Sequence, residues 1–265
     1  MILRIAILLL VFFMPGCEER YMTELQSEET GLLAVEGVLT NENISHKINL
    51  SFPYRTLNGD GTPASGAVVQ VQEGTGTVYT FSEDPTTPGA YYSPPFRAVF
   101  GVTYTLQIGL NGRQYQAQDS SVPVGPMGPL QVQPIDEQFE LVLNETGDDP
   151  YYIDHQLSWK NTSACLPNEA CEGRVVFYDL KSIDVNEIYK PAKKQFLFPA
   201  GTTVIRKKHS VSAAYRAYLR SVLSETEWRG GIFDVDRANP TSNLTSGATG
   251  FFAITTVVSD TTVVQ

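Results

Sequence analysis

Short segments in which apolar and polar residues alternate run through most of the chain. Alternation at every second position is typical of a β-strand with one buried face. The clearest example is TYTLQIGL, residues 103–110, which is followed by Asn111-Gly112 and then by RQYQAQ. Asn-Gly favours the positive φ angles of a two-residue type I′ turn. This stretch therefore predicts a β-hairpin.

Other strands are expected before this hairpin, where Gly, Pro and Asn separate the apolar runs. They are LLAVEGVLT from Leu32, KINLSF from Lys47, SGAVVQVQE from Ser65 and TVYTFSE from Thr77. About five to seven short strands in a segment of this length are typical of an immunoglobulin-like β-sandwich. We expect that sandwich over residues 31–122.

A segment rich in proline and glycine, SSVPVGPMGPLQVQP, begins at Ser120. Proline cannot donate to a central ladder and glycine loosens the chain, so we predict a linker over 123–135. A second β-rich module should occupy 136–265. Its expected strands are FELVLN from Phe139, YYIDHQLSW from Tyr151, RVVFYDL from Arg174, KQFLFP from Lys194 and GFFAITTVVSD from Gly250.

One segment of the second module has helical periodicity. Its apolar residues recur at intervals of three and four: Tyr215, Tyr218, Leu219, Val222 and Leu223. Such a stripe predicts a helix that faces a core, here over about 212–228. Ser212 is suited to cap its start and Gly230-Gly231 to end it. The expected fold class is mainly β, with an N-terminal immunoglobulin-like sandwich and a second β-rich module that carries one amphipathic helix.

The first 16 residues have the layout of a secretory signal. Arg4 lies in a basic n-region, and the apolar run from Ile5 to Phe13 is shorter than the roughly 20 residues that a membrane-spanning helix needs. Met14-Pro15-Gly16-Cys17 resembles the bacterial lipobox, although Met14 and Pro15 depart from its usual residues. The resemblance implies that residues 1–16 are removed and that Cys17 is acylated. An ordinary signal with a nearby cleavage site is the alternative.

Acidic residues follow the predicted lipidation site. Glu18 and Glu19 resemble the export signal of Bacteroidota lipoproteins, which implies display on the outer face of the outer membrane. Residues 17–30 would then form an acidic tether. We therefore expect an outer-membrane protein that is anchored by lipid and faces the cell surface.

The charge balance restricts the possible partners. The chain has 19 Lys and Arg against 29 Asp and Glu, a net charge of −10. Its longest basic run is Arg206-Lys207-Lys208. Nucleic-acid binding needs a basic stripe, so we expect no nucleic-acid partner. Attachment to a membrane should come from the lipid rather than from basic residues.

Two further cysteines, Cys165 and Cys171, lie in SACLPNEACEGR. With Cys17 acylated, an oxidising compartment favours a disulfide between them. Free thiols are the main alternative. A zinc site is less favoured, since the sequence offers no second cysteine pair and no nearby histidine.

The residues that could carry catalysis are scattered. The three histidines belong to no metalloprotease motif, and the sequence has no nucleophile elbow or P-loop. Asp148-Asp149 with Asp154 and His155 could hold a hard cation, but alternation places Asp154 and His155 on opposite faces of a strand. Asn58-Gly59-Asp60-Gly61 lacks the later ligands of a calcium loop. We therefore expect no catalytic site, no cofactor and no metal.

Two groups of residues are better suited to binding. Trp228, Arg229, Phe233 and Arg237 follow the predicted helix, and Tyr91, Tyr92 and Phe96 lie in a proline-rich stretch between strands. Exposed aromatic residues and arginine are enriched in interfaces. A buried loop plug for the first group and core filling for the second are the alternatives.

The order of several segments resembles a known family. They are VEGVLT, SGAVVQV, the helix YRAYLRSVL, the segment EWRGGIFDVDRANPTSNL and the strand GFFAITTVV. In this order they resemble the Bacteroidota outer-membrane lipoprotein family catalogued as domain of unknown function 4249. The resemblance implies an accessory lipoprotein that accompanies a TonB-dependent transporter, and it assigns no catalytic or binding residues.

These observations favour a non-enzymatic surface lipoprotein that is an accessory or ligand-binding partner of such a transporter. A structural or adhesive surface protein is the alternative, and a degradative enzyme is less favoured.

Overall fold

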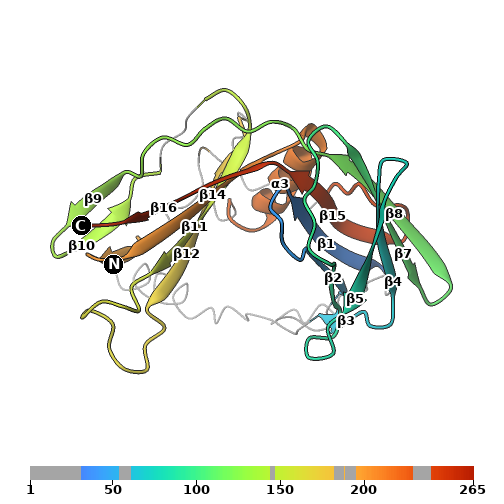
Figure 1. The fold of residues 1–265 in the computed structure, drawn as a ribbon, viewed down its shortest axis with the longest axis horizontal. Coiled ribbons are helices and arrows are strands. Elements are labelled where there is room, and N and C mark those ends of the chain that lie inside the picture. The colour runs from blue at the N-terminus through green and yellow to red at the C-terminus, as the bar shows by residue number, and fades with distance from the viewer. Residues whose placement is uncertain (1–30, 54–60, 144–146, 182–187, 189–194, 229–239) are drawn as a thin grey trace, which may run out of the picture. The chain divides into compact units, whose positions relative to one another are not determined.

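Strands are the main secondary structure of the described chain, as the alternating pattern predicts. The computed structural model describes residues 31–53, 61–143, 147–181, 188, 195–228 and 240–265. Within them lie the strands β1 to β16 and the helix α3, arranged in sheets of nine, three and four strands (Figure 1). The expectation of a mainly β fold is confirmed.

The nine-stranded sheet has the strand order β15-β1-β2-β6-β5-β4-β7-β8, and β3 pairs with β2. Its strands are β1 Leu33–Thr40, β2 Lys47–Phe52, β3 Thr62–Pro63, β4 Val68–Glu73, β5 Val78–Glu83, β6 Ala90–Tyr92, β7 Thr103–Leu110, β8 Arg113–Ser120 and β15 Ala248–Thr255. The two ends of this order, β15 and β8, lie next to each other. The sheet therefore folds over one core, as a sandwich.

The predicted hairpin is present as β7 and β8. Leu110 pairs with Arg113, and the two residues between them, Asn111 and Gly112, have φ angles of 50° and 75°. Both values are positive, as a type I′ turn requires. The side chains that alternate inward from β7 are buried in the sandwich core: Tyr104, Leu106, Ile108 and Leu110.

The C-terminal part of the chain is divided between two sheets, which differs from the expectation. The segment GFFAITTVVSD was placed in the second module, but β15 lies parallel to β1, with Val35 opposite Gly250. β16 Val257–Val263 pairs instead with β14 Thr203–Ser210. β15 is buried on both faces, since Phe252 lies in the sandwich core and Phe251 in a second core beside α3. An apolar run without alternation is typical of a parallel strand covered on both sides.

The other two sheets come from the second half of the chain. The four-stranded sheet has the order β12-β11-β14-β16, and the three-stranded sheet has the order β13-β10-β9. The strands not yet given are β9 Val132–Ile135, β10 Gln138–Leu141, β11 Tyr151–Ser158, β12 Glu172–Asp179 and β13 Leu197–Pro199. The predicted linker, 123–135, therefore contributes a strand. Pro134 fits there because β9 is an edge strand.

The helix α3 spans Ala213–Glu225. The hydroxyl of Ser212 accepts a hydrogen bond from the N–H of Tyr215 at 3.2 Å, which confirms the predicted cap. The helix ends at Glu225, before the predicted Gly230-Gly231, and the N–H of Trp228 donates to the carbonyl oxygen of Leu223. Residues 229–239 lie outside the described chain.

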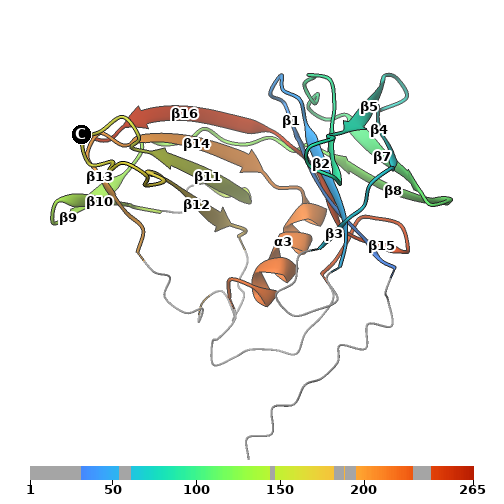
Figure 2. The same cartoon turned by 90° about the horizontal axis from the view of Figure 1, so that it is seen from below.

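The helix α3 lies between strands of two sheets (Figure 2), and aromatic rings connect it to both. Tyr215 contacts Phe251 of β15 with a centroid distance of 5.0 Å and Tyr152 of β11 with a distance of 6.4 Å. Leu219, Leu223 and other apolar side chains complete this core. The helix thus positions β11, on which the candidate site lies.

Candidate functional site

The strand β11 carries two polar residues that the sequence singled out, Asp154 and His155. Its neighbours are β12, where Asp154 pairs with Val176, and β14, where His155 pairs with Arg206. Successive side chains of a strand point to opposite faces. The structure accordingly separates the two residues, as expected, and each has its own set of partners.

Asp154 forms an ion pair on its face of the sheet. Nε of Arg174 donates to Oδ1 of Asp154 at 2.7 Å, and Nε2 of Gln156 donates to Oδ2 at 3.0 Å. Burial opposes ionisation of Asp154, but the hydrogen bonds from Arg174 and Gln156 outweigh it and lower the pKa of this carboxyl group. An ionised, paired carboxylate is suited to a structural role.

Asp148 and Asp149 lie away from that pair, in the turn before β11, where Gly147 has a φ of 79°. The described residues include no group of three or more His, Cys, Asp or Glu that could hold a metal ion. The loop 58–60 lies outside the described chain.

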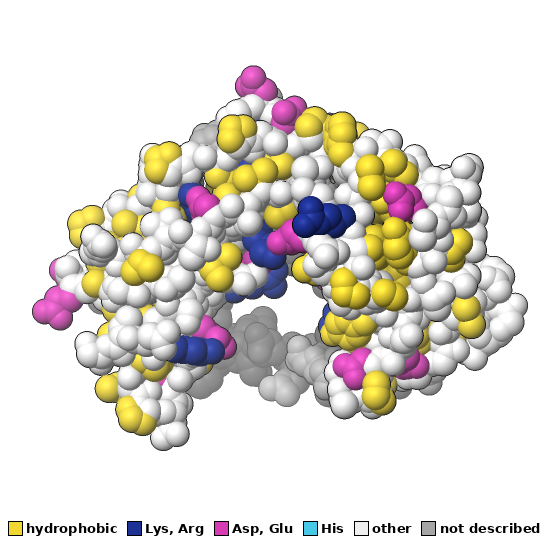
Figure 3. Space-filling model, in the orientation of Figure 1, with side chains coloured by type: hydrophobic (Ala, Val, Ile, Leu, Met, Phe, Trp, Pro, Cys, Tyr) yellow, Lys and Arg dark blue, Asp and Glu magenta, His cyan; other side chains and the backbone are white. Residues whose placement is uncertain are grey.

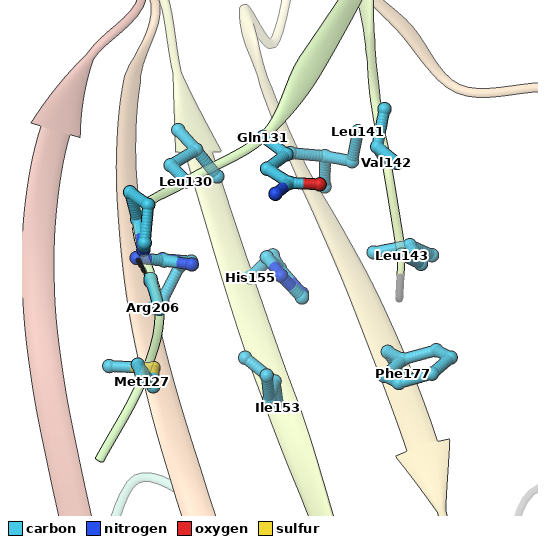
Figure 4. Close-up of a pocket in the computed structure, with 12 residues that line it drawn as sticks. Met127, Leu130, Gln131, Leu141, Val142, Leu143, Ile153, His155, Phe177 and Arg206 are labelled. Atoms are coloured by element: carbon cyan, nitrogen blue, oxygen red, sulfur yellow. Dashed lines mark hydrogen bonds between the residues drawn. The ribbon is translucent and has the colours of Figure 1, made fainter. Parts of the chain in front are cut away.

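His155 lines a cavity on the opposite face of the four-stranded sheet (Figure 4). The cavity has a volume of about 90 Å³. Its floor is formed by β11, β12 and β14, through Ile153, His155, Phe177 and Arg206. Its other wall is formed by residues 127–131 of the Pro/Gly segment and by 141–143.

The two ionisable residues of the cavity are almost fully buried, with 4% of His155 and 6% of Arg206 exposed. Nδ1 of His155 donates to the carbonyl oxygen of Val175 at 3.1 Å. Burial lowers the pKa of His155, and the nearby Arg206 lowers it further. The imidazole is therefore neutral near pH 7, which leaves Nε2 as an acceptor.

Arg206 is held by β16 and by the Pro/Gly segment. Its Nε donates to Oδ1 of Asp260 at 2.8 Å, and Nη2 donates to Oδ2 of Asp260 and to the carbonyl oxygen of Gly128. The pair with Asp260 neutralises the guanidinium charge. In Figure 4 the guanidinium group extends toward His155.

A second buried cation holds the same segment. Nζ of Lys208 lies 4.0 Å from the ring centroid of Tyr151 and donates to the carbonyl oxygen of Pro126 at 3.4 Å. Burial lowers the pKa of Lys208. Proline N atoms cannot donate, but carbonyl oxygens of this segment accept from Arg206 and Lys208. These bonds fix the wall of the cavity, which the sequence indicated only as a linker.

Some charged side chains elsewhere form ion pairs. Nζ of Lys207 donates to both carboxylate oxygens of Glu42, at 2.8 and 3.1 Å. On the face drawn in Figure 3, most Lys and Arg side chains lie next to Asp or Glu rather than in a continuous stripe. This face therefore has no extended basic surface.

Cys165 and Cys171 are joined by a disulfide, with a Cα–Cα distance of 5.6 Å. The bridge lies in the connection between β11 and β12. The N–H of Trp159 donates to the carbonyl oxygen of Cys171 at 2.9 Å. The bridge therefore lies close to the end of β11, the strand that carries His155.

The candidate contact residues after the helix are only partly described. Trp228 is 3% exposed and belongs to the core beside α3, so its ring is not available to a partner. Arg229, Phe233 and Arg237 lie outside the described chain. The structure favours the buried-plug alternative for Trp228.

The second candidate group is mainly part of the sandwich core. The hydroxyl of Tyr91 donates to the carbonyl oxygen of Ala64 at 2.8 Å, and Phe96 stacks on Tyr79 at a centroid distance of 3.8 Å. Tyr91 and Phe96 are buried, which corrects their assignment to a contact surface. Tyr92 is 37% exposed and lies under Nζ of Lys47 at 5.9 Å.

Sequence reasoning missed a more exposed apolar pair on the sandwich. Val99 and Phe100 are 48% and 58% exposed, in the turn before β7. The N–H of Val102 donates to the carbonyl oxygen of Val99, and Gly101 has a φ of 75°. The signal in the sequence was RAVFGV, an apolar run that ends in a turn glycine.

The predicted lipidation site and export signal, Cys17, Glu18 and Glu19, lie outside the described chain. Within the described residues, no helix has the length and apolar character needed to cross a membrane.

Comparison with known proteins identifies the family. A search against curated proteins found no match to the chain. The model of one protein family, Domain of unknown function (DUF4249), matches residues 18–261. This match covers most of the 265 residues and agrees with the resemblance found in the sequence. The chain is therefore a member of the DUF4249 family.

Proposed function

We propose that this protein is a non-enzymatic lipoprotein of the outer membrane that binds a TonB-dependent transporter as its accessory. One observation carries the proposal: the family match begins at residue 18, directly after the cysteine of the lipobox-like sequence. The family domain thus coincides with the chain that would remain after cleavage before Cys17. The family resemblance implies that the partner is a TonB-dependent transporter.

The geometry of the described residues supports binding rather than catalysis as the proposed role. Asp154 is paired with Arg174, and Arg206 is paired with Asp260. In each pair the carboxylate accepts a hydrogen bond from a guanidinium group, an arrangement suited to holding neighbouring strands in register. A lipid anchor confines a protein to the plane of its partner, so a modest interface is sufficient to keep the two together.

The turn at 97–101 is the contact surface that we propose. Phe100 is the most exposed aromatic side chain among the described large apolar residues, and Val99 lies beside it. Exposed aromatic residues that become buried at the centre of an interface contribute much of its binding energy. Of the candidate group Tyr91, Tyr92 and Phe96, Tyr92 is the residue whose side chain remains accessible to a partner.

The test is copurification from native outer membranes in mild detergent. The wild-type protein should bring down a transporter barrel, and Phe100→Ala should reduce the recovered barrel about tenfold, as loss of an interface anchor does. Val78→Ala is the matched control, because Val78 is 50% exposed on β5. It should leave recovery unchanged.

The possible outcomes distinguish a wrong contact surface from a wrong function. Wild-type recovery with Phe100→Ala would remove the 97–101 turn from the proposal. Absence of any barrel with the wild-type protein would remove the accessory function itself. Retention on cells or matrix without a barrel would favour the adhesive alternative.

A further inference from the structure

β16 forms one edge of the four-stranded sheet: β14 pairs with one side of it, and no described strand pairs with the other (Figure 2). Natural proteins usually protect such an edge with lysine, proline or a β-bulge, because its unpaired backbone groups can bind another strand. The edge strand β9, for example, contains Pro134. β16 has the sequence VVSDTTV, and it pairs with β14 from Val257 to Val263 without a break in register. β16 therefore has none of these three protections.

Alternate residues of β16 direct their backbone groups away from β14. The N–H of Val264 donates to the carbonyl oxygen of Thr202 at 2.9 Å, and the carbonyl oxygen of Thr256 accepts from the N–H of Ser210 at 2.9 Å. In an antiparallel pair every second residue bonds to the neighbouring strand. The even-numbered residues of β16 therefore face β14, and the odd-numbered residues face outward.

The first outward-facing residue already has a partner. The N–H of Val257 donates to Oδ1 of Asn41 at 2.7 Å, and Nδ2 of Asn41 donates to the carbonyl oxygen of Val257 at 3.3 Å. The carboxamide thus pairs with Val257 as the backbone of a neighbouring strand would. The next outward-facing residues are Ser259, Thr261 and Val263, which are exposed and have no such contact with the described residues. Their N–H and C=O groups are available to a further strand.

A second copy of β16 matches these groups. In an antiparallel pair with a two-fold axis at Thr261, this residue lies opposite Thr261 of the second copy, and Ser259 lies opposite Val263 of the second copy. Every outward N–H and C=O of the three residues then has a backbone partner. The side chains fit as well, because opposite threonines are a favourable cross-strand pair.

Charge and the Asn41 contact exclude the neighbouring register. An axis at Asp260 would place this carboxylate opposite itself, and like charges directly opposite destabilise a sheet. It would also need the backbone groups of Val257, which Asn41 occupies. With the axis at Thr261, Asp260 lies opposite Thr262, whose hydroxyl group can donate to the carboxylate. An axis at Thr262 would extend the pairing beyond the end of β16.

We propose that two copies of this protein pair through β16, about a two-fold axis at Thr261, and join their four-stranded sheets into one continuous sheet. The chain has a net charge of −10, but this edge is locally neutral because its one charged side chain, Asp260, is paired with Arg206. An edge contact buries little surface, so the dimer is reversible and forms at high protein concentration. The inference goes beyond the proposed transporter partner and does not depend on it.

The first test is disulfide trapping of the purified full chain in a glutathione buffer. Directly opposite residues of a hydrogen-bonded antiparallel pair lie about 5.5 Å apart between Cα atoms, which a disulfide can span. Thr261→Cys should therefore form linked dimers about tenfold faster than random collision allows, because pairing raises the effective concentration of the thiols.

Ser259→Cys is the matched control, since it is exposed on the same edge. In the proposed register its thiol lies four residues, or about 13 Å, from Ser259→Cys of the second copy, which is too far for a disulfide. Ser259→Cys alone should therefore stay monomeric. A mixture of Ser259→Cys and Val263→Cys proteins should form linked dimers, because these two positions are opposite.

The second test uses charge and measures self-association by sedimentation at low salt. Thr261→Lys places two lysines opposite each other and should weaken the dimer about fivefold or more. Thr262→Lys is the control: it adds the same charge one residue away but places it opposite Asp260 of the second copy, so it should not weaken the dimer. Both threonines are exposed, so both variants should keep the wild-type urea midpoint.

Three results would each overturn the proposal. They are a wild-type protein that stays monomeric at every concentration, linkage of Thr261→Cys no faster than that of Ser259→Cys, and equal weakening by the two lysine variants. An edge that binds an extended segment of a different protein would give the first of these results.

Discussion

At the scale of single residues, Gly250 is the described glycine at which an added side chain would lie closest to a neighbouring backbone atom. Its φ is 96°, and a Cβ atom there would lie 2.0 Å from the carbonyl oxygen of Val35 on the neighbouring strand. Gly250→Ala should lower the free energy of unfolding by about 3 kcal/mol or more, through backbone strain and displacement of β1. Urea denaturation measures the change.

Gly125→Ala is the control for this substitution. A Cβ atom at Gly125 has no neighbour within 4 Å, so the same chemical change should alter stability by less than about 1 kcal/mol. Similar losses for both variants would show that the parallel pairing of β1 and β15 is not as close as described.

A second prediction at this scale concerns His209, which stacks on Tyr152 at 4.4 Å. Burial lowers the pKa of His209 to about 4, from an ordinary value of 6.5. Between pH 6.5 and about pH 4, His209 therefore binds a proton in the unfolded chain but not in the folded chain. The stability that neutral His209 contributes is complete above pH 6.5 and is lost as the pH falls toward 4, by about 3 kcal/mol.

The measurement is the free energy of unfolding in urea from pH 7 to pH 4.5, for the wild type and for His209→Phe. Phenylalanine keeps an aromatic ring against Tyr152 but cannot titrate. The variant should lose part of the acid destabilisation, and identical pH profiles would contradict the assigned burial. His46 and His155, whose pKa values burial also lowers, retain their contributions in both proteins.

At the scale of elements, the sequence predicted the elements that are determined by residues close together in the chain. Asn111-Gly112 defined the β7–β8 hairpin, and Ser212 with its following apolar stripe defined the start of α3. β15 was assigned to the wrong sheet because parallel pairing with β1 joins residues more than 200 positions apart and leaves no turn in the sequence. Burial on both faces also removes the alternation that identifies a half-exposed strand.

The candidate site was predictable only in part, for the same reason. Alternation correctly placed Asp154 and His155 on opposite faces of one strand. The cavity depends on the carbonyl oxygens of Pro126 and Gly128, which accept from Lys208 and Arg206 across the fold. Backbone acceptors have no signature in side-chain composition, so the Pro/Gly segment was interpreted as a linker.

The connection between β11 and β12 carries the third prediction, a disulfide between Cys165 and Cys171. Loss of both sulfur atoms, in a Cys165→Ser and Cys171→Ser double variant, should lower the free energy of unfolding by about 2–3 kcal/mol, because the bridge closes a short loop. Intact-mass measurement without reductant should give the oxidised mass. Two thiols that react with an alkylating reagent in the folded, lipidated protein would contradict it.

At the scale of the whole molecule, the location of the protein depends on Cys17. Cys17→Ala should leave an uncleaved or mislocalised precursor, since the acylated thiol is what the lipobox resemblance implies. Fractionation and mass measurement of the N-terminus distinguish the two forms. Normal processing and unchanged membrane partitioning of the variant would show that an ordinary signal is present instead.

The parallel pairing of β1 with β15 has a mechanical consequence. A pull on the N-terminus enters the fold at Leu33, where β1 begins beside Ala248. The load acts along the two strands, so their ladder of hydrogen bonds resists in shear rather than opening one bond at a time. One residue, Thr256, separates β15 from β16 in the four-stranded sheet. Thr256 is therefore a direct covalent route by which force reaches the sheet that carries His155, beside the contacts that α3 makes with both sheets.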